Sequence, residues 1–152
     1  MAPLEDRIRR LEDIEEIKIL LIDYGRHLDR MDLEAYSQLF ARDGEWSGGL
    51  GSARTPEGIR EMLEKAIGAA RAAAGPGPPR RVGQNHVMSN MRIEVDGDTA
   101  TAWSRWSWVT PGSDGAPAVS RNGHYDDVLV REDGRWKFKS RAAVTDLQAE
   151  PQ

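Results

Sequence analysis

The first thirty residues carry apolar side chains at the spacing of an α-helix. One face repeats at intervals of three and four: Ile14, Ile17, Leu21, Tyr24 and Leu28. The spacing predicts a helix over residues 4–31. Its central stretch, residues 17–22, is apolar nearly all round, so we expect this helix to contact partners on more than one side, either a sheet or another subunit.

Two further helices are predicted before the middle of the chain. The first covers residues 33–40, and the second begins after Thr55, a good N-cap residue that is followed by a proline. Trp46 opens a brief extended piece between them. The second helix ends in a loop, residues 75–84, whose Gly-Pro-Gly-Pro-Pro start excludes helix and central strand. The sequence leaves open whether this loop covers a site as a lid.

After this loop the apolar period changes from 3.6 to 2, which is typical of strands. Four long strands separated by turn residues are predicted, over 85–95, 99–109, 120–131 and 135–144. Helices followed by an antiparallel meander indicate an α+β fold with the helices on one face of the sheet. No repeat or linker interrupts the pattern, so we expect a single domain over residues 1–152.

Composition narrows the possible functions. The chain has 152 residues, a net charge of −4 and no cysteine. A mildly acidic chain is poorly suited to a phosphate backbone, so nucleic acid is not expected as a partner. The lack of cysteine excludes disulfides, thiolate nucleophiles and cysteine zinc sites. No stretch is apolar enough to span a membrane and no signal core is visible, so we expect a cytoplasmic protein with no membrane partner.

The chemistry that the residues allow is acid–base chemistry without a cofactor. There is no glycine-rich phosphate loop, no spacing of metal ligands and no nucleophile elbow. Strand alternation places His86, Met88 and Asn90 on one face, which would be lined with apolar groups. Asp29, near the end of the first helix, is the natural carboxylate partner for His86, and the pair would form a general base. The alternative is a core histidine bonded to backbone, with Asp29 a solvated acid at a helix end.

Aromatic residues on the strands allow two interpretations. Trp106 and Trp108 share one face of the 99–109 strand, where they either belong to the core or line a pocket for a flat apolar ligand. On the last two strands, Arg141 is placed to form a structural ion pair with Asp126 or Asp127.

Several short stretches together resemble a known family. They are residues 17–32, 86–90, 96–100, and 123–127 running into 133–138. Their order and spacing resemble the polyketide-cyclase-like (SnoaL-like) branch of the nuclear-transport-factor-2-like superfamily, which includes scytalone dehydratase and the bile-acid 7α-dehydratase. The resemblance covers about residues 11–144. It implies a cystatin-like cone, in which three N-terminal helices pack on a strongly curved antiparallel sheet around one conical pocket.

The resemblance also implies site residues. Asp29 and His86 occupy the positions of the dehydratase acid–base pair, and Tyr24 matches a tyrosine five residues before the aspartate of the bile-acid enzyme. By similarity, the substrate-binding residues that line the cavity would be Trp46, Asn90, Trp106, Trp108 and Tyr125.

This chain departs from the family pattern around that pair. Gly123 and Tyr125 stand where scytalone dehydratase places serine and asparagine, and its second pocket histidine aligns near Thr110. Thr145 aligns with a late arginine of the bile-acid enzyme.

The sequence therefore leads to two functional hypotheses. The first is a cofactor-independent lyase or isomerase, dehydratase-like, acting on a hydroxylated ring compound, with a small apolar or aromatic ligand and no metal. The second is a non-catalytic module for ligand binding or subunit assembly, like the β subunits of ring-hydroxylating dioxygenases. We expect a homodimer or homotrimer that associates through the open face of the sheet.

Overall fold

The computed structural model describes residues 1–73 and 83–148. Its helices are α1 (Leu4–Arg30), α2 (Leu33–Ser37) and α3 (Pro56–Ala73). Its strands are β1 (Phe40–Gly48), β2 (Gly51–Arg54), β3 (Asn85–Asp96), β4 (Thr99–Pro111), β5 (Pro117–Glu132) and β6 (Arg135–Gln148). They form one six-stranded sheet in the order β2-β1-β6-β5-β4-β3. Most of the predicted 75–84 loop lies outside the described residues.

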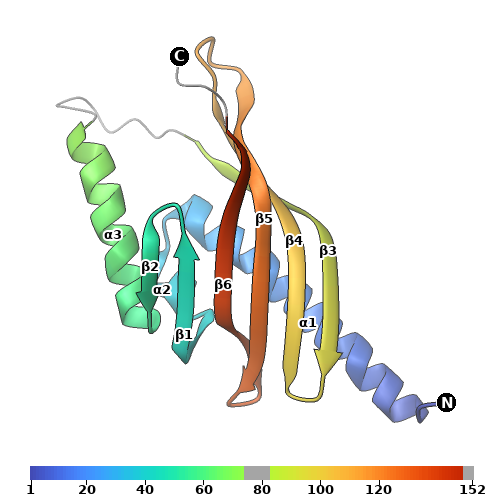
Figure 1. Cartoon of the computed structure of the whole chain (residues 1–152). Helices are drawn as coiled ribbons and strands as arrows, with labels where there is room; N and C mark the ends of the chain where they lie inside the picture. Colours follow the sequence, from blue (N-terminus) through green and yellow to red (C-terminus); the bar gives the residue numbers. More distant parts are fainter. Residues whose placement is uncertain (74–82, 149–152) are drawn as a thin grey trace.

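All three helices lie on the same side of the sheet (Figure 1). The long α1 crosses behind the strands and contacts both β3, at one edge of the sheet, and β6, three strands away. Between helices and sheet lies an aromatic core, in which the ring of Tyr24 is 4.9 Å from that of Tyr36 and 5.3 Å from that of Tyr125. The core therefore sits beneath α1, on the face that the apolar spacing predicted.

A tight turn ends α1 and directs the chain into α2. Met31 adopts the left-handed conformation, with a φ of 58°, and its N–H donates to the Leu28 carbonyl oxygen at 3.0 Å. The Asp32 carboxylate then accepts the N–H of Ala35 at 3.1 Å and caps α2. This turn fixes Asp29 in the last turn of α1, facing the start of β3.

The β1–β2 hairpin corrects the sequence prediction. Only a brief extended piece was expected near Trp46, but β1 and β2 form a hairpin between α2 and α3. β1 also pairs parallel with β6, so the sheet is mixed and not wholly antiparallel. The buried face of β1 includes Gly44, where a side chain would lie 2.9 Å from the Phe138 carbonyl oxygen. A glycine at an inward position hides the alternation that marks a strand. The strong curvature expected from the resemblance stays a prediction.

A β-bulge in β3 corrects a second prediction. Asn90 has a φ of 51°, is exposed, and lies within the register shift between Ser89 and Arg92. The extra residue places Met91, Ile93 and Val95 on the helix side, while Arg92 and Glu94 are exposed. The expectation that Asn90 shares the face of His86 is therefore wrong, because simple alternation fails where asparagine takes a left-handed conformation.

No helix in the described ranges is both long enough and apolar enough to cross a membrane.

Candidate active site

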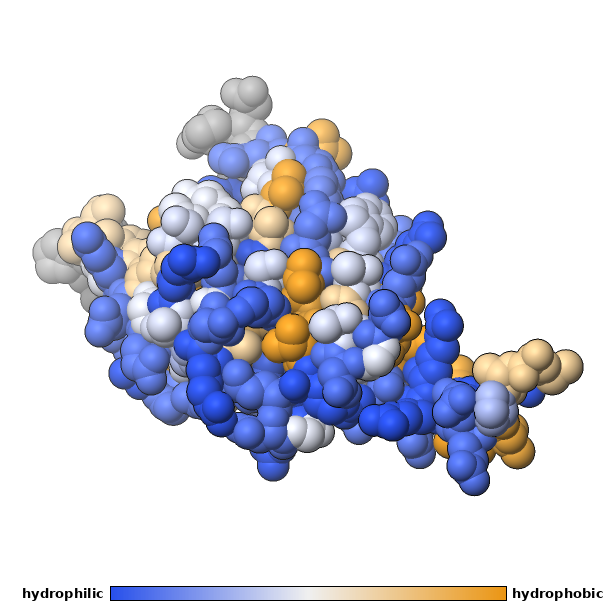
Figure 2. Space-filling view, turned by 60° about the horizontal axis from the view of Figure 1, so that its bottom comes forward, coloured by the Kyte–Doolittle hydropathy of each residue, from blue (hydrophilic) through white to orange (hydrophobic). Residues whose placement is uncertain are grey.

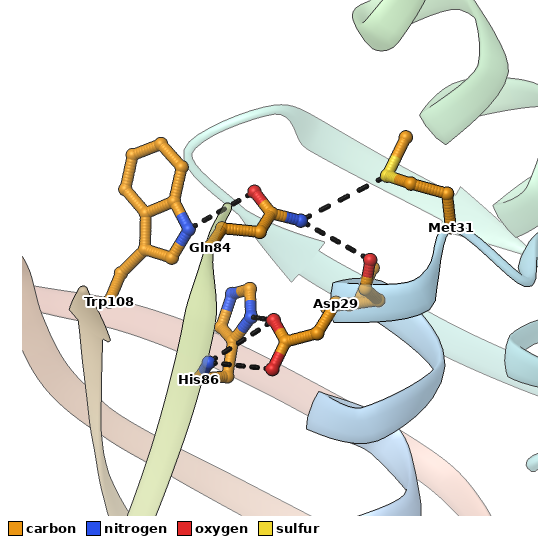
Figure 3. A network of polar contacts seen from close by, with 6 residues as sticks. Asp29, Met31, Gln84, His86 and Trp108 are labelled. Atoms are coloured by element: carbon orange, nitrogen blue, oxygen red, sulfur yellow. Dashed lines mark hydrogen bonds and ion pairs between the residues drawn. The ribbon is translucent and has the colours of Figure 1, made fainter. Parts of the chain in front are cut away.

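Asp29 and His86 are in direct contact. The carboxylate oxygen Oδ1 of Asp29 lies 2.6 Å from Nδ1 of His86, and the backbone N–H of His86 donates to both carboxylate oxygens, at 3.1 and 2.9 Å (Figure 3). Both side chains are mostly buried, with 20% of Asp29 and 15% of His86 exposed. The two backbone contacts hold the carboxylate in place, and the third contact orients the imidazole ring towards it.

This geometry determines which ring nitrogen can act as a base. An ionised carboxylate only accepts hydrogen bonds, so Nδ1 of a neutral His86 carries the proton that it donates to Asp29. Nε2 is then the nitrogen with the free lone pair. The arrangement can take a proton at Nε2 and stabilise the resulting imidazolium through Asp29.

Gly25 brings the two elements of the pair together. It lies one turn before Asp29 on α1, and a side-chain carbon at this position would lie 3.1 Å from Cβ of His86. The glycine thus allows α1 to pack closely on the beginning of β3. Sequence reasoning missed this residue, because a glycine within an apolar helix gives no signal of what it faces.

A second polar network lies beside the pair (Figure 3). The Gln84 side-chain amide donates to the Leu28 carbonyl oxygen at 3.2 Å and accepts the indole N–H of Trp108 at 3.3 Å. The Trp108 ring stacks near the His86 ring, with centroids 6.4 Å apart and an angle of 28° between the planes. Gln84 thereby ties the end of α1 to β4. Its role was not expected, since it falls in the predicted loop.

Asp29 and His86 line a surface hollow of about 540 Å³. The other lining residues are Ile22, Arg26, Arg30, Gln84, Asn85 and Met88. Of these six residues, Ile22 and Met88 are apolar. The other four carry two guanidinium groups and two side-chain amides. The hollow is thus more polar and more cationic than the apolar pocket that was expected.

The interior of the fold contains a buried ion pair. Nε and Nη2 of Arg141 donate to the two carboxylate oxygens of Asp127, both at 2.7 Å, and neither side chain has any exposed surface. The guanidinium carbon lies 4.1, 4.0 and 4.1 Å from the ring centres of Tyr24, Tyr125 and Phe138. Of the two acids proposed from the sequence as partners of Arg141, Asp127 is therefore the one that pairs.

Burial and charge set the protonation states in this interior. Burial raises the pKa of the Tyr36 and Tyr125 hydroxyls well above the ordinary value, so both stay protonated. Burial lowers the pKa of Arg141, but the charge and hydrogen bonds of Asp127 outweigh it, and the net shift is upward. Burial also raises the pKa of Asp127, while Arg141 opposes this rise. The two short bonds fit an ionised pair.

Three of the predicted site residues lie in this interior or close to it. The indole N–H of Trp46 donates to the Tyr24 hydroxyl at 2.9 Å, and both side chains are buried. Tyr125 is buried against Arg141. Among the described residues, no hydrogen bond joins Tyr24 to Asp29 or His86. The structure thus does not bring Tyr24, Trp46 and Tyr125 to the hollow at His86.

The remaining predicted residues lie in three different places. Trp106 is buried, and its indole N–H donates to the His124 carbonyl oxygen at 3.1 Å. Trp108 alone of the predicted aromatic residues contacts the His86 network. Asn90 lies on the bulge described above.

Among residues 1–73 and 83–148, no cluster of three or more histidine and acidic side chains could hold a metal ion.

A second histidine–aspartate contact lies on the opposite face of the sheet. Nδ1 of His124 is 2.9 Å from both carboxylate oxygens of Asp146, and the His124 ring stacks on Trp103. This pair has the same residue types as the first but lies on the face that no helix covers. It therefore offers a matched comparison for tests of His86.

Comparison with known proteins gives the family. Residues 9–142 match the family described as the SnoaL-like domain. The chain belongs to this family. Solved structures share its fold, among them an NTF2-like protein with a cystatin-like fold from Novosphingobium aromaticivorans (28% identity, TM-score 0.80, covering 96% of this chain and 92% of that one). None of the curated proteins matches the chain.

Two further solved structures have the same fold. A protein from Novosphingobium aromaticivorans provisionally named a scytalone dehydratase is 26% identical, with a TM-score of 0.73, over 94% of this SnoaL-like chain and 90% of that one. The β subunit of a provisionally assigned aromatic-ring-hydroxylating dioxygenase from the same species is 20% identical, with a TM-score of 0.70, over 93% and 94%. The second likeness shows the fold alone.

Proposed function

We propose that this SnoaL-like protein is a cofactor-independent lyase or isomerase of the dehydratase type, which acts on a hydroxylated ring compound. The observation that carries the proposal is the contact of 2.6 Å between Asp29 and Nδ1 of His86 at the edge of a hollow. A positioned histidine that a carboxylate orients can act as the general base that removes a proton from carbon. The similarity to a provisionally named scytalone dehydratase supports the same reaction class.

In the proposed reaction, Nε2 of His86 removes a proton from a ring carbon next to the one that bears the hydroxyl group. The electron pair of the broken C–H bond forms a double bond as the hydroxyl group leaves. The imidazolium then returns its proton to the departing hydroxide, which leaves as water, and His86 is restored. In an isomerisation the imidazolium instead delivers its proton to another carbon. Tyr24 was the alternative proton donor, but its hydroxyl is buried beside Trp46, so we assign the proton return to His86.

The rim of the hollow supports a ligand that also carries an acidic substituent. Arg26 and Arg30 supply guanidinium groups there, and guanidinium binds carboxylate or phosphate groups in a forked geometry. We therefore include ring compounds with and without a carboxylate in the ligands to be screened.

The experiment combines a binding screen with turnover. Aromatic, polyketide-like and steroid hydroxy compounds are screened by thermal shift, and each binder is followed by absorbance for the new double bond. We expect His86→Ala to bind the same compounds and to lose about 10²- to 10⁴-fold in turnover. Asp29→Asn should lower turnover as well, because it removes the carboxylate that orients Nδ1. His124→Ala is the matched control and should leave turnover unchanged. Wild-type turnover in His86→Ala would contradict the mechanism.

The second candidate is a non-catalytic module for ligand binding or subunit assembly. The observation that favours it is the buried cluster of Arg141, Asp127 and Tyr125, which lies in the interior where the conical pocket was expected. A dioxygenase β subunit has the same fold. Under this alternative, no ring compound in the screen is turned over, and the His86 and Asp29 variants behave like wild type in every assay.

A further inference from the structure

The helix α1 has a second apolar stripe, which the fold leaves uncovered. Its core face is buried, with Ile17 and Leu21 at 0% exposure. The opposite side carries five large apolar residues that are 46% to 67% exposed: Leu4, Ile8, Leu11, Ile19 and Ile22. Figure 2 shows apolar surface at the end of the molecule where α1 projects beyond the sheet. A surface helix needs only one apolar stripe, and an exposed second one marks an interface.

The spacing along this stripe is that of a coiled-coil seam. Positions 4, 8, 11, 15, 18 and 22 follow one another at alternating intervals of four and three. These intervals define the a and d positions of a heptad repeat. Two consecutive positions, between Leu11 and Ile22, are occupied by Glu15 and Lys18, which form an exposed ion pair of 3.3 Å within the helix. A seam that contains one acid and one base side by side favours one orientation of its partner.

We propose that a second copy of this chain packs its α1 antiparallel along this stripe. In an antiparallel pair, each a position faces a d position of the other helix. Glu15 then faces the partner's Lys18, and Lys18 faces the partner's Glu15, so that both central contacts are attractive. Leu11 and Ile22 form the apolar layers on either side in the same reciprocal way. A parallel pair would place Glu15 against the partner's Glu15, which is repulsive.

The e positions, which flank the seam on one side, agree with this orientation. They carry Glu5 and Glu12 in the first half of the helix and Arg26 in the second, whereas Arg7 flanks the first half on the other side. Antiparallel packing brings these two glutamates towards the partner's Arg26. The same register carries the first turn of the partner's α1 to the rim of the hollow that Asp29 and His86 line. The assembly would thus close that rim with a second copy of the chain.

The outer face of the sheet is the competing surface. It is free of helices and exposes Val87, Val128 and Val144, at 51%, 42% and 38%. Its centre is interrupted by the charged cluster of Arg105, His124 and Asp146. The α1 stripe is preferred because Glu15 and Lys18 on it complement the same residues of a second copy.

Single cysteines test both the occupant and its orientation, because the chain has no cysteine of its own. Leu11→Cys and Ile22→Cys chains are mixed and oxidised mildly, and cross-links are measured by non-reducing electrophoresis. We expect cross-linked dimers in the mixture and few in either variant alone, because the antiparallel register separates Leu11 from the partner's Leu11 by about 16 Å. Cross-linking of Leu11→Cys with itself would overturn the antiparallel arrangement.

Charge reversal gives a second, independent readout by analytical ultracentrifugation. Glu15→Lys should weaken dimerisation at least about tenfold, which corresponds to about 1.4 kcal/mol. The double change Glu15→Lys with Lys18→Glu should restore dimerisation, and Val128→Glu on the outer sheet face should have no effect. Circular dichroism confirms that each variant is folded. A monomeric wild-type chain, or a dimer that only Val128→Glu dissociates, would overturn the proposal.

Discussion

At the scale of single residues, the interior depends on one ion pair. Arg141 and Asp127 make two bonds of 2.7 Å with no exposed surface, under three aromatic rings. Removing two charges from water costs free energy that their attraction only partly returns. The pair therefore need not add stability as a whole, but losing one member leaves a buried charge with no counterion.

Asp127→Asn tests this dependence. We expect the free energy of unfolding in urea to fall by about 3–5 kcal/mol, because the guanidinium of Arg141 keeps its charge in the core. Replacing both members, with Asp127→Leu and Arg141→Met, should cost less than the single change. Asp126→Asn is the matched control on the exposed side of the same strand, where 62% of the side chain is exposed, and should change stability by less than about 0.5 kcal/mol. A small effect of Asp127→Asn would contradict the argument.

The sequence could indicate that Arg141 forms an ion pair on these strands, but not that the pair is fully buried. The strands around Arg141 left two adjacent acids as partners, and alternation places only one of them inside the fold. The register that pairs Asp127 with Arg141 decides between them. A fully buried arginine goes against the usual preference of charged residues for the surface. Only the packing of three rings from α1, β5 and β6 makes it possible, and no single segment encodes that packing.

At the scale of elements, the site depends on how closely α1 approaches β3. Gly25→Ala adds a methyl group 3.1 Å from Cβ of His86. The gain of about 1 kcal/mol in helix propensity is offset by displacement of the helix or strand, so net stability should change by less than about 1 kcal/mol. The contact between Asp29 and His86 should loosen, which nuclear magnetic resonance of the His86 ring nitrogens would detect.

Gly68→Ala in α3 is the control for that substitution. A methyl group at Gly68 meets no atom within 4 Å. This change should raise stability by up to about 1 kcal/mol and leave the His86 resonances unchanged. Equal stabilisation by both substitutions, with unchanged ring resonances in both, would show that Gly25 does not set the spacing of the pair.

Local sequence patterns predicted the helices and the long strands but missed the β1–β2 hairpin and the β-bulge in β3. The three helices and four long strands follow from runs with a clear period, so their existence could be predicted. The β1–β2 hairpin could not, because Gly44 occupies an inward position and leaves no apolar signal. The bulge at Asn90 shifts the face of every later residue in β3. The catalytic roles of Asp29, His86 and Tyr24 remain predictions, although the first two are in contact.

At the scale of the whole molecule, α1 links strands that are distant in the sheet. It contacts β3 at one edge and β6 three strands away, and its Tyr24 ring contacts the Tyr125 ring of β5, which lies between them. The aromatic core joins α1, α2, β5 and β6 through rings within 6 Å of one another. Our proposal of a single domain over residues 1–152 rests on this sharing of one core.

A single domain of this size should unfold in one cooperative transition. Far-UV circular dichroism reports mainly on the helices, whereas tryptophan fluorescence reports on the sheet through Trp106 in β4, Trp136 in β6 and their neighbours. We expect both signals to give the same midpoint in urea, because α1 cannot leave the sheet without exposing the core that holds the tryptophans. Separate midpoints, with helix signal lost first, would show that α1 and the sheet are independent units. The acid–base pair, which takes one member from each, would then lack the rigid support that its mechanism requires.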